Sequence, residues 1–299
     1  MLGSSQMLEK IDLNKKISKK EFKKIFPRLR MQLYALQKAS WDAEIPVIIL
    51  FEGWDAAGKG TSIQNLTSKL DPRGFKLYPI RAARTYENER PWLWRFWLKI
   101  PGKGEWAIFD RSWYGRTLVE RVEGLIPKSS WQRAYRDIVN FERTLADEGY
   151  LIIKFFLHIS RKEQKRRFDK LISDPLTSWQ VLPEDWEHHK QYDEWLLAYE
   201  ETFERTETES GPWTIVEATN RRYTTVKIFR TLVASLEEKL AIMDALPDPA
   251  YWQKPADSLE EHEQEEVQEL SEHDLDNGES NLEGALLEDE IGNEVSTSD

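Results

Sequence analysis

The sequence contains no cysteine and no apolar run of about 18 residues, the length that a membrane-spanning helix needs. The lack of cysteine excludes a disulfide framework and a thiolate zinc site, so stability has to come from packing. The opening residues "MLGSSQMLEKIDLNKK" contain no apolar segment of signal-peptide length. We therefore expect a soluble cytoplasmic protein with no membrane partner.

Lysine and arginine are absent from residues 257–299, which contain 17 aspartate or glutamate residues. The whole chain carries a net charge of −11, so residues 1–256 carry +6. An acidic segment with almost no aromatic residues cannot bury enough apolar surface to offset its ordering entropy, and we expect 257–299 to be a disordered tail. The basic remainder of the chain suits an anionic partner.

Five short apolar segments alternate with stretches long enough for a helix, which predicts a parallel sheet with helices on both faces. We expect an N-terminal helical extension over 1–45 and a main domain over 46–245, with a helical lid at about 160–200. Residues 18–40 have helical spacing with Ser18 as a cap, and Pro27 should break or kink that helix. The predicted strands are 46–53, 75–82, 105–112, 150–159 and 212–219. The other predicted helices are 58–70, 89–98, 115–123, 129–148, 160–172, 183–208 and 221–242.

The glycine-rich segment "FEGWDAAGKGT" (51–61) joins a predicted buried strand to a predicted helix. Backbone N–H groups at such a helix N-terminus can surround a phosphate while a lysine reaches an outer oxygen. The residue after the lysine is Gly60, at a position where a serine or threonine hydroxyl normally binds magnesium. The candidate phosphate-binding residues here are Gly53, Ala57, Gly58, Lys59, Gly60 and Thr61.

Two aspartates are the candidate metal ligands, with Mg²⁺ as the expected ion and Mn²⁺ as an alternative. Asp55 lies inside the glycine loop, where a carboxylate would repel phosphate unless a hard cation lay between them. Asp110 ends the third predicted strand in "AIFDRSWYGR", the position of a magnesium-binding carboxylate in phosphate-transfer enzymes. Each aspartate could instead only cap a loop or helix, and the hydroxyl of Thr61 could replace the one missing at position 60.

Arginines follow the same third strand. Arg111 and Arg116 lie close to Asp110 in the sequence and could neutralise charge that develops on a transferred phosphoryl group. Trp113 and Tyr114, between them, are expected in the core or in the wall of the site.

A basic helix is predicted after the fourth strand in "SRKEQKRRFDK" (160–170). Such a helix could form a lid that closes over phosphates and excludes water. Arg166 and Arg167 are its candidate phosphate ligands. Upstream, "RAARTYENERPWLWRFWLK" places Arg84 among aromatic residues that could hold a nucleotide or simply belong to the core.

The ordered segments "EGWDAAGKG", "LDPRGF", "FDRSWYGRTLVERVEG", "FERTLADEGYLIIKFFLHIS" and "PWTIVEATNRRY" resemble the family-2 polyphosphate kinases. The resemblance runs from about Pro46 to Leu236. It implies a P-loop kinase fold similar to thymidylate kinase, an α/β three-layer sandwich in which helices flank a five-stranded parallel sheet and form a lid. Glycine after the loop lysine and aspartate within the loop are features of that family, so Gly60 is not a sign of decay.

The resemblance also implies transfer of a phosphoryl group between inorganic polyphosphate and a nucleotide, with magnesium. Asp55 and Asp110 then organise the metal and the reacting phosphates, Lys59 and Arg111 stabilise charge, and Arg116 supplies the basic position that closes the motif. Our candidate nucleotide-binding residues are Arg84, Glu120 and Arg121.

Within the family, "DRSWYGR" with "PWLWRFW" resembles the polyphosphate:AMP phosphotransferase type, which implies conversion of AMP to ADP. Those enzymes usually contain two fused kinase-like domains, whereas this chain has one P-loop, so ADP, alone or with AMP, is kept as an alternative acceptor. An ATP-dependent nucleotide kinase is disfavoured by Gly60. A silent polyphosphate- or nucleic-acid-binding protein is disfavoured by the intact Asp55, Lys59, Asp110 and Arg111. We expect a homo-oligomer with no nucleic-acid partner.

Overall fold

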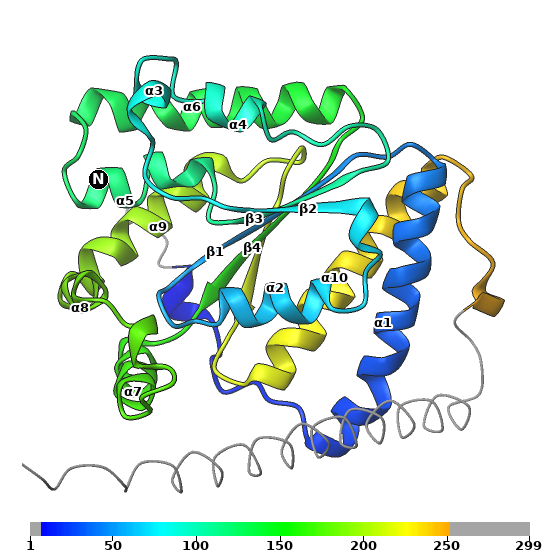
Figure 1. Cartoon of the computed structure of the whole chain (residues 1–299), viewed down its shortest axis with the longest axis horizontal. Helices are drawn as coiled ribbons and strands as arrows, with labels where there is room; N and C mark the ends of the chain where they lie inside the picture. Colours follow the sequence, from blue (N-terminus) through cyan, green and yellow to red (C-terminus); the bar gives the residue numbers. More distant parts are fainter. Residues whose placement is uncertain (1–6, 252–299) are drawn as a thin grey trace, which may run out of the picture. The chain divides into compact units, whose positions relative to one another are not determined.

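A five-stranded parallel sheet forms the centre of the structure, a computed structural model that describes residues 7–251 (Figure 1). The strand order is β2-β3-β1-β4-β5, so the first strand in the sequence lies in the middle of the sheet. The described chain forms one compact unit up to Asp248, and the predicted acidic tail lies outside the described residues. The strands are β1 (Val47–Gly53), β2 (Phe75–Pro79), β3 (Trp106–Asp110), β4 (Leu151–His158) and β5 (Trp213–Glu217), as the sequence predicts.

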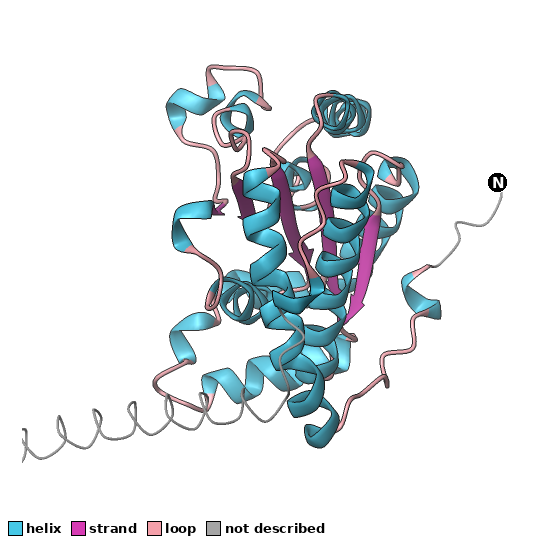
Figure 2. Cartoon of the chain, turned by 90° about the vertical axis from the view of Figure 1, so that its right-hand side faces the viewer, coloured by secondary structure: helices cyan, strands magenta, loops and turns pink. Residues whose placement is uncertain are grey.

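Helices cover both faces of this sheet, which confirms the predicted three-layer α/β architecture (Figures 1 and 2). On one face, α2 (Lys59–Thr67) and α10 (Arg221–Ile242) contact the strands, and α1 (Lys19–Asp42) packs along α10. On the other face, α6 (Lys128–Asp147) contacts β4 and packs against α9 (Tyr192–Thr206). The remaining α-helices are α3 (Thr85–Asn88), α4 (Trp94–Trp97), α5 (Val119–Val122), α7 (Arg161–Ile172) and α8 (Pro183–Lys190). The 3₁₀ turns are η1 (Leu8–Lys10), η2 (Pro72–Gly74), η3 (Trp113–Arg116), η4 (Ser178–Gln180) and η5 (Pro249–Tyr251).

Pro27 does not break the first helix, because α1 runs through it for 24 residues; the kink that was the alternative stays a prediction. Ser18 caps the helix as predicted, with a reciprocal bond from Glu21. Proline removes one backbone hydrogen bond, but here the helix also packs through apolar contacts. Phe26 stacks on Phe22 and meets Phe229 of α10 edge-on, at ring centroid distances of 4.8 and 4.9 Å. The contact with Phe229 holds α1 on α10 at the residue that precedes Pro27.

Three other predicted helices are shorter than expected. The stretch 183–208 divides into α8 and α9 at Gln191, whose backbone has φ −87° and ψ 21° and so leaves the regular helix. The predicted helices 89–98 and 115–123 are represented by single turns, α4 and α5. Within the described part of the chain, no helix is long and apolar enough to cross a membrane.

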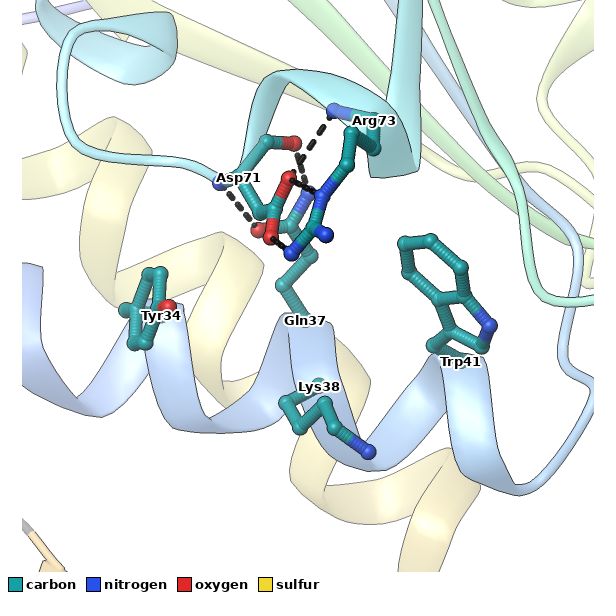
Figure 3. A pocket seen from close by; sticks show the side chains of 6 residues that line it. All are labelled: Tyr34, Gln37, Lys38, Trp41, Asp71 and Arg73. Carbon is teal, nitrogen blue, oxygen red and sulfur yellow. Dashed lines mark hydrogen bonds and ion pairs between the residues drawn. The ribbon is translucent and has the colours of Figure 1, made fainter.

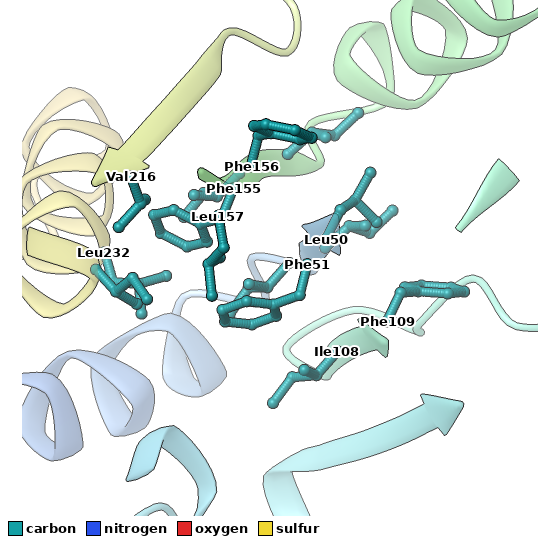
Figure 4. Packing of buried hydrophobic residues seen from close by; sticks show 14 of the residues in the cluster. Leu50, Phe51, Ile108, Phe109, Phe155, Phe156, Leu157, Val216 and Leu232 are labelled. Atoms are coloured by element: carbon teal, nitrogen blue, oxygen red, sulfur yellow. The ribbon is translucent and has the colours of Figure 1, made fainter. Parts of the chain in front are cut away.

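The central strands carry the hydrophobic core (Figure 4). Every residue of β1 is buried, as expected for a parallel strand covered on both faces. Phe51 of β1 stacks on Phe155 of β4 at a ring centroid distance of 5.3 Å, and Leu50 and Ile108 belong to the same buried cluster. Because the core surrounds β1, the loop that follows it starts from a rigid base.

A buried ion pair lies beneath the turn that follows β3. Lys154 Nζ of β4 lies 2.9 Å from Glu142 Oε2 of α6, and both side chains have no solvent exposure. The other carboxylate oxygen of Glu142 accepts hydrogen bonds from Trp113 Nε1 at 2.9 Å and the Tyr114 hydroxyl at 2.8 Å. Burial lowers the pKa of Lys154, while Glu142 opposes that shift. Trp113 and Tyr114 are fully buried, which confirms their predicted place in the core.

Replacing Lys154 by methionine should destabilise the protein by about 3–5 kcal/mol, because Glu142 would keep a buried charge without its partner. Chemical denaturation followed by circular dichroism measures this change. Lys76→Gln is the control, since Lys76 and its partner Glu105 are 60% and 42% exposed and such pairs contribute about 0–1 kcal/mol. Equal losses in the two variants would contradict a structural role for the buried pair.

Candidate active site

The register of the parallel strands brings three loops to one edge of the sheet. Phe51 of β1 pairs with Asp110 of β3, and Gly53 pairs with Leu157 of β4. The backbone N–H of Arg111 donates to the Phe51 carbonyl at 3.0 Å, which fixes the turn after β3 against the end of β1. The loops after β1, β3 and β4 therefore start side by side at the carboxyl edge, where ligands bind in open α/β sheets.

The glycine loop has the backbone of an anion-binding turn. Gly53, Ala56 and Gly58 have φ values of 136°, 59° and 104°, and Gly58 is the N-cap of α2. Left-handed residues alternating with ordinary ones turn successive N–H groups toward one concavity. A side chain at Gly53 would also collide with the backbone of Leu157. The sequence therefore places glycine where the loop needs both close approach and an unusual backbone.

An aromatic stack anchors the start of this loop. The Trp54 ring lies parallel to Tyr192, the first residue of α9, at a centroid distance of 3.9 Å and an interplanar angle of 5°. Trp54 Nε1 donates to His158 Nδ1 at the end of β4, at 3.0 Å. The glycine loop is thus fixed to β4 and α9 immediately before Asp55.

Asp55 is the centre of charge in the site. Its Oδ1 accepts a hydrogen bond from Arg111 Nη2 at 3.0 Å and lies 3.8 Å from Lys59 Nζ. Its Oδ2 lies 3.1 Å from His188 Nδ1. Burial alone would raise the pKa of Asp55, but the His188 hydrogen bond and the positive charges of Lys59 and Arg111 outweigh it and hold that pKa well below its usual value. Asp55 is therefore ionised at neutral pH.

The side chain of Lys59 folds back onto the backbone of the glycine loop. Its Nζ donates to the carbonyls of Gly53 and Trp54 at 2.7 and 3.1 Å. Burial lowers the pKa of Lys59, and the negative charges of Asp55 and Asp110 oppose that shift. The structure thus brings Asp55, Lys59 and Arg111 into direct contact, with Asp110 close enough to act on Lys59 electrostatically.

A further carboxylate, Glu52, lies just before the loop and was missed by the sequence analysis. It is 5% exposed and accepts a hydrogen bond from Ser112 Oγ at 2.7 Å. Burial raises the pKa of Glu52, while Ser112 and the charges of Lys59 and Arg111 oppose the shift. This bond joins the ends of β1 and β3 on the core side of the site.

The helix α8 brings a histidine to the site that the sequence analysis also missed. His188 Nε2 lies 2.8 Å from Glu123 Oε1, so the ring connects the glycine loop to the segment after α5. The Asp55 hydrogen bond raises the pKa of His188 against the opposing effect of burial, and Glu123 adds to the rise. The segment "PEDWEHHK" contained a signal for it, since Asp185 and His188 have the spacing of one helix face.

Asp55, Asp185 and His188 form a group that could hold a metal ion. One ligand atom from each lies within 4.8 Å of the others, and among the described residues this group does not include Asp110. The structure therefore places Asp55 in a candidate metal group and adds two neighbours to it. The metal role of Asp110, half-buried at the end of β3, stays a prediction.

The two candidate arginines of α7 have different surroundings. Arg166 is 63% exposed, and both of its bonds go to Glu163 one turn earlier. Arg167 is 9% exposed, and its guanidinium donates to loop carbonyls, including that of Ala57 at 2.9 Å. Of these two residues, Arg166 presents its charge to solvent, whereas Arg167 is buried between α7 and the glycine loop.

The other predicted arginines line the turn after β3 and its neighbours. Arg116 Nη1 bonds to Glu120 Oε2 at 2.5 Å, so two candidate residues form one ion pair. Arg121 points elsewhere, because it bonds to Glu201 of α9 at 2.9 Å and to the Tyr135 hydroxyl of α6 at 2.7 Å. The exposed Arg84 lies at the start of α3, and Gly60 and Thr61 are exposed in the first turn of α2.

A separate hollow lies between α1 and η2 (Figure 3). Because η2 precedes β2, this hollow is at the amino edge of the sheet, opposite the loops described above. It is lined by Tyr34, Gln37, Lys38, Trp41, Asp71 and Arg73.

Comparison with known proteins identifies the family. The family model for polyphosphate kinase 2 (PPK2) matches residues 16–243. The chain belongs to the polyphosphate kinase 2 family. A polyphosphate:AMP phosphotransferase of Pseudomonas aeruginosa is 37% identical over 236 residues, covering 79% of this chain and 48% of that relative. This PPK2 chain thus spans about half the length of that relative.

The match to this chain covers a larger share of two other relatives. An AMP/ADP-polyphosphate phosphotransferase of Meiothermus ruber is 35% identical, covering 74% of this chain and 83% of the relative. The crystal structure of polyphosphate kinase 2 from Arthrobacter aurescens has a TM-score of 0.76 at 27% identity, covering 85% of this chain and 90% of that one. The family match confirms the P-loop kinase fold that the sequence resemblance implied.

Gly58→Ala should destabilise this PPK2 domain by about 1–3 kcal/mol, because the backbone at φ 104° is strained for any residue with a Cβ. The space is open, so a steric clash would not be the cause. Gly60→Ala is the matched control, because it lies two residues away in α2 with equally open space, and should be neutral or stabilise by about 0.4–1 kcal/mol. Chemical denaturation of both variants tests this, and a Gly58→Ala variant as stable as Gly60→Ala would show that the loop adopts another backbone.

Proposed function

We propose that this protein transfers a phosphoryl group from inorganic polyphosphate to AMP, giving ADP, with Mg²⁺ as the cofactor. The observation that carries the proposal is the contact of Asp55 with Lys59 and Arg111 at an anion-binding loop, beside Asp110. Family membership and the activities for which the relatives are named support the same reaction. ADP, alone or with AMP, is the alternative acceptor, since the Meiothermus ruber relative is named for both nucleotides.

The chemistry of the donor set fits a hard divalent cation. Asp55 and Asp110 offer carboxylate oxygens, which Mg²⁺ and Mn²⁺ accept readily. Asp55 is held ionised by its neighbours, as a metal ligand has to be. A cation held by Asp55 and Asp110 would neutralise part of the charge on the reacting phosphates. The imidazole of His188 is a less usual ligand for Mg²⁺, so we assign it to orienting Asp55.

The chain's own residues supply positioning and charge. The acceptor is a phosphate that is already ionised at neutral pH, so no general base is required. The N–H groups of the glycine loop and the cations of Lys59 and Arg111 stabilise the oxygens of the transferred group. Arg166 lies exposed on α7, where it can meet the outer part of a long polyanion. We propose that the segment 160–200 is a lid that excludes water.

The setting of the enzyme follows the sequence-based expectations. We propose a cytoplasmic homo-oligomer whose partners are inorganic polyphosphate and AMP or ADP, with no nucleic-acid or membrane partner. Arg84, Glu120 and Arg121 stay our predicted nucleotide contacts.

A donor and acceptor panel tests the proposed reaction. The protein is incubated with AMP or ADP and either polyphosphate or ATP, with and without Mg²⁺, and the nucleotides are separated. We expect ADP from AMP only with polyphosphate and Mg²⁺ present. Product from ATP but not from polyphosphate would instead identify an ATP-dependent nucleotide kinase. If polyphosphate gives ATP from ADP but no product from AMP, ADP is the acceptor.

Asp110→Asn should lower kcat by about 10²–10³-fold, because a charge-stabilising group at a phosphoryl-transfer site contributes about 3–4 kcal/mol to the barrier. The same expectation holds for Asp55→Asn. Steady-state rates at saturating Mg²⁺ and polyphosphate measure the effect. Asp42→Asn on α1, an exposed aspartate at the amino edge of the sheet, is the control. Undiminished transfer by Asp110→Asn would remove it from the metal assignment.

A further inference from the structure

In the glycine loop, the five consecutive carbonyl groups of residues 53–57 accept hydrogen bonds from side chains. Lys59 takes the carbonyls of Gly53 and Trp54. The next three carbonyls are taken from α7. Gln164 Nε2 donates to the Asp55 carbonyl at 3.2 Å, and Arg167 Nη1 donates to those of Ala56 and Ala57, each at 2.9 Å.

Arg167 also reaches a second loop. Its Nη2 donates to the carbonyls of Ala218 and Thr219, after β5, at 2.6 and 3.2 Å. Its Nε donates to Glu163 Oε1 at 2.7 Å. The guanidinium is thus fully committed to protein acceptors, and it spans from the loop after β1 to the loop after β5, on either side of β4 in the sheet.

We propose that Arg167, assisted by Gln164, is a positioning residue that holds the carbonyl side of the glycine loop so that the N–H side stays open to phosphate. This inference rests on the proposed function and replaces the expectation that Arg167 binds phosphate directly. Each peptide unit is planar, so fixing the Ala57 carbonyl also fixes the direction of the Gly58 N–H group. Gly58 has φ 104° and no side chain that could restrict its backbone, so a hydrogen bond to the preceding carbonyl restrains it.

The fork of the guanidinium is essential to this role. Two loops are held by two different nitrogens, which the single ammonium of a lysine cannot reproduce. A direct phosphate ligand behaves differently, since a lysine there would keep much of the electrostatic attraction. Arg167→Lys therefore separates a positioning role from a phosphate contact.

The experiment compares Arg167→Lys and Arg167→Gln with the parent protein. Tripolyphosphate binding is measured by calorimetry at several salt concentrations, and polyphosphate-dependent turnover is measured at saturating nucleotide. We expect both variants to lose about 10²-fold in kcat/KM for polyphosphate, as for a small misplacement of a site. The nucleotide KM should change little. The slope of log affinity against log salt should stay that of the parent, because no phosphate contact is lost.

Lys165→Gln is the control, since it removes one exposed charge from the same helix, where Lys165 pairs with Asp169. It should keep kcat/KM within about threefold of the parent, as for an exposed ion pair. If Arg167→Gln fails to fold by circular dichroism, Arg167→Lys and Gln164→Leu carry the test, and Gln164→Leu should show a smaller loss in the same direction.

Three results would overturn the inference. These are an Arg167→Lys variant that retains near-parental kcat/KM, a salt slope reduced by about one unit in Arg167→Gln, and parental behaviour of both variants. Failure of the proposed function is recognised separately, because the parent protein would then show no polyphosphate turnover. The binding and salt-slope measurements still test Arg167 in that case.

Discussion

The parallel register of β1 between β3 and β4 is the constraint on which the site depends. Pairing Phe51 with Asp110, and Gly53 with Leu157, makes three strands end at one level. A shift of one residue would turn the buried side chains of β1 to the opposite face, so the core prevents it. The position of Asp110 relative to the glycine loop is therefore a product of packing, and the loop only has to supply the correct backbone.

Charge is distributed unevenly between the two sides of this edge. Toward the core, the Glu52 carboxylate accepts a hydrogen bond from the neutral hydroxyl of Ser112. Toward the open side, Arg111, Lys59 and His188 all surround Asp55. Lys59 and Arg111 are the permanent cations beside Asp55, and a phosphate bound next to this carboxylate would share them. Burial strengthens these interactions because little water screens them.

Much of this arrangement could be predicted from the sequence, because short buried strands and a glycine loop are local patterns. The five strands, the Ser18 cap and the buried Trp113 and Tyr114 are examples. The features that the sequence does not predict depend on contacts between residues that are far apart in the chain. Pro27 stays helical because of packing on α10, and helical spacing alone cannot say whether Arg166 or Arg167 faces solvent. The bridge from His188 to Asp55 spans 133 positions, so the local spacing of Asp185 and His188 could not show that the histidine meets Asp55.

The turn after β3 combines two sets of side chains on one short segment. Asp110 and Arg111 lie at the open edge, and Arg111 adopts φ 62° to do so. Ser112, Trp113 and Tyr114 are buried, and the last two bond to the Glu142 carboxylate inside the domain. Sequence similarity in this turn between two proteins therefore reflects, in part, similar packing of their cores. Whether two proteins catalyse the same reaction has to be judged from the residues at the open edge. A family member that kept the same core but changed its chemistry would still retain the buried residues.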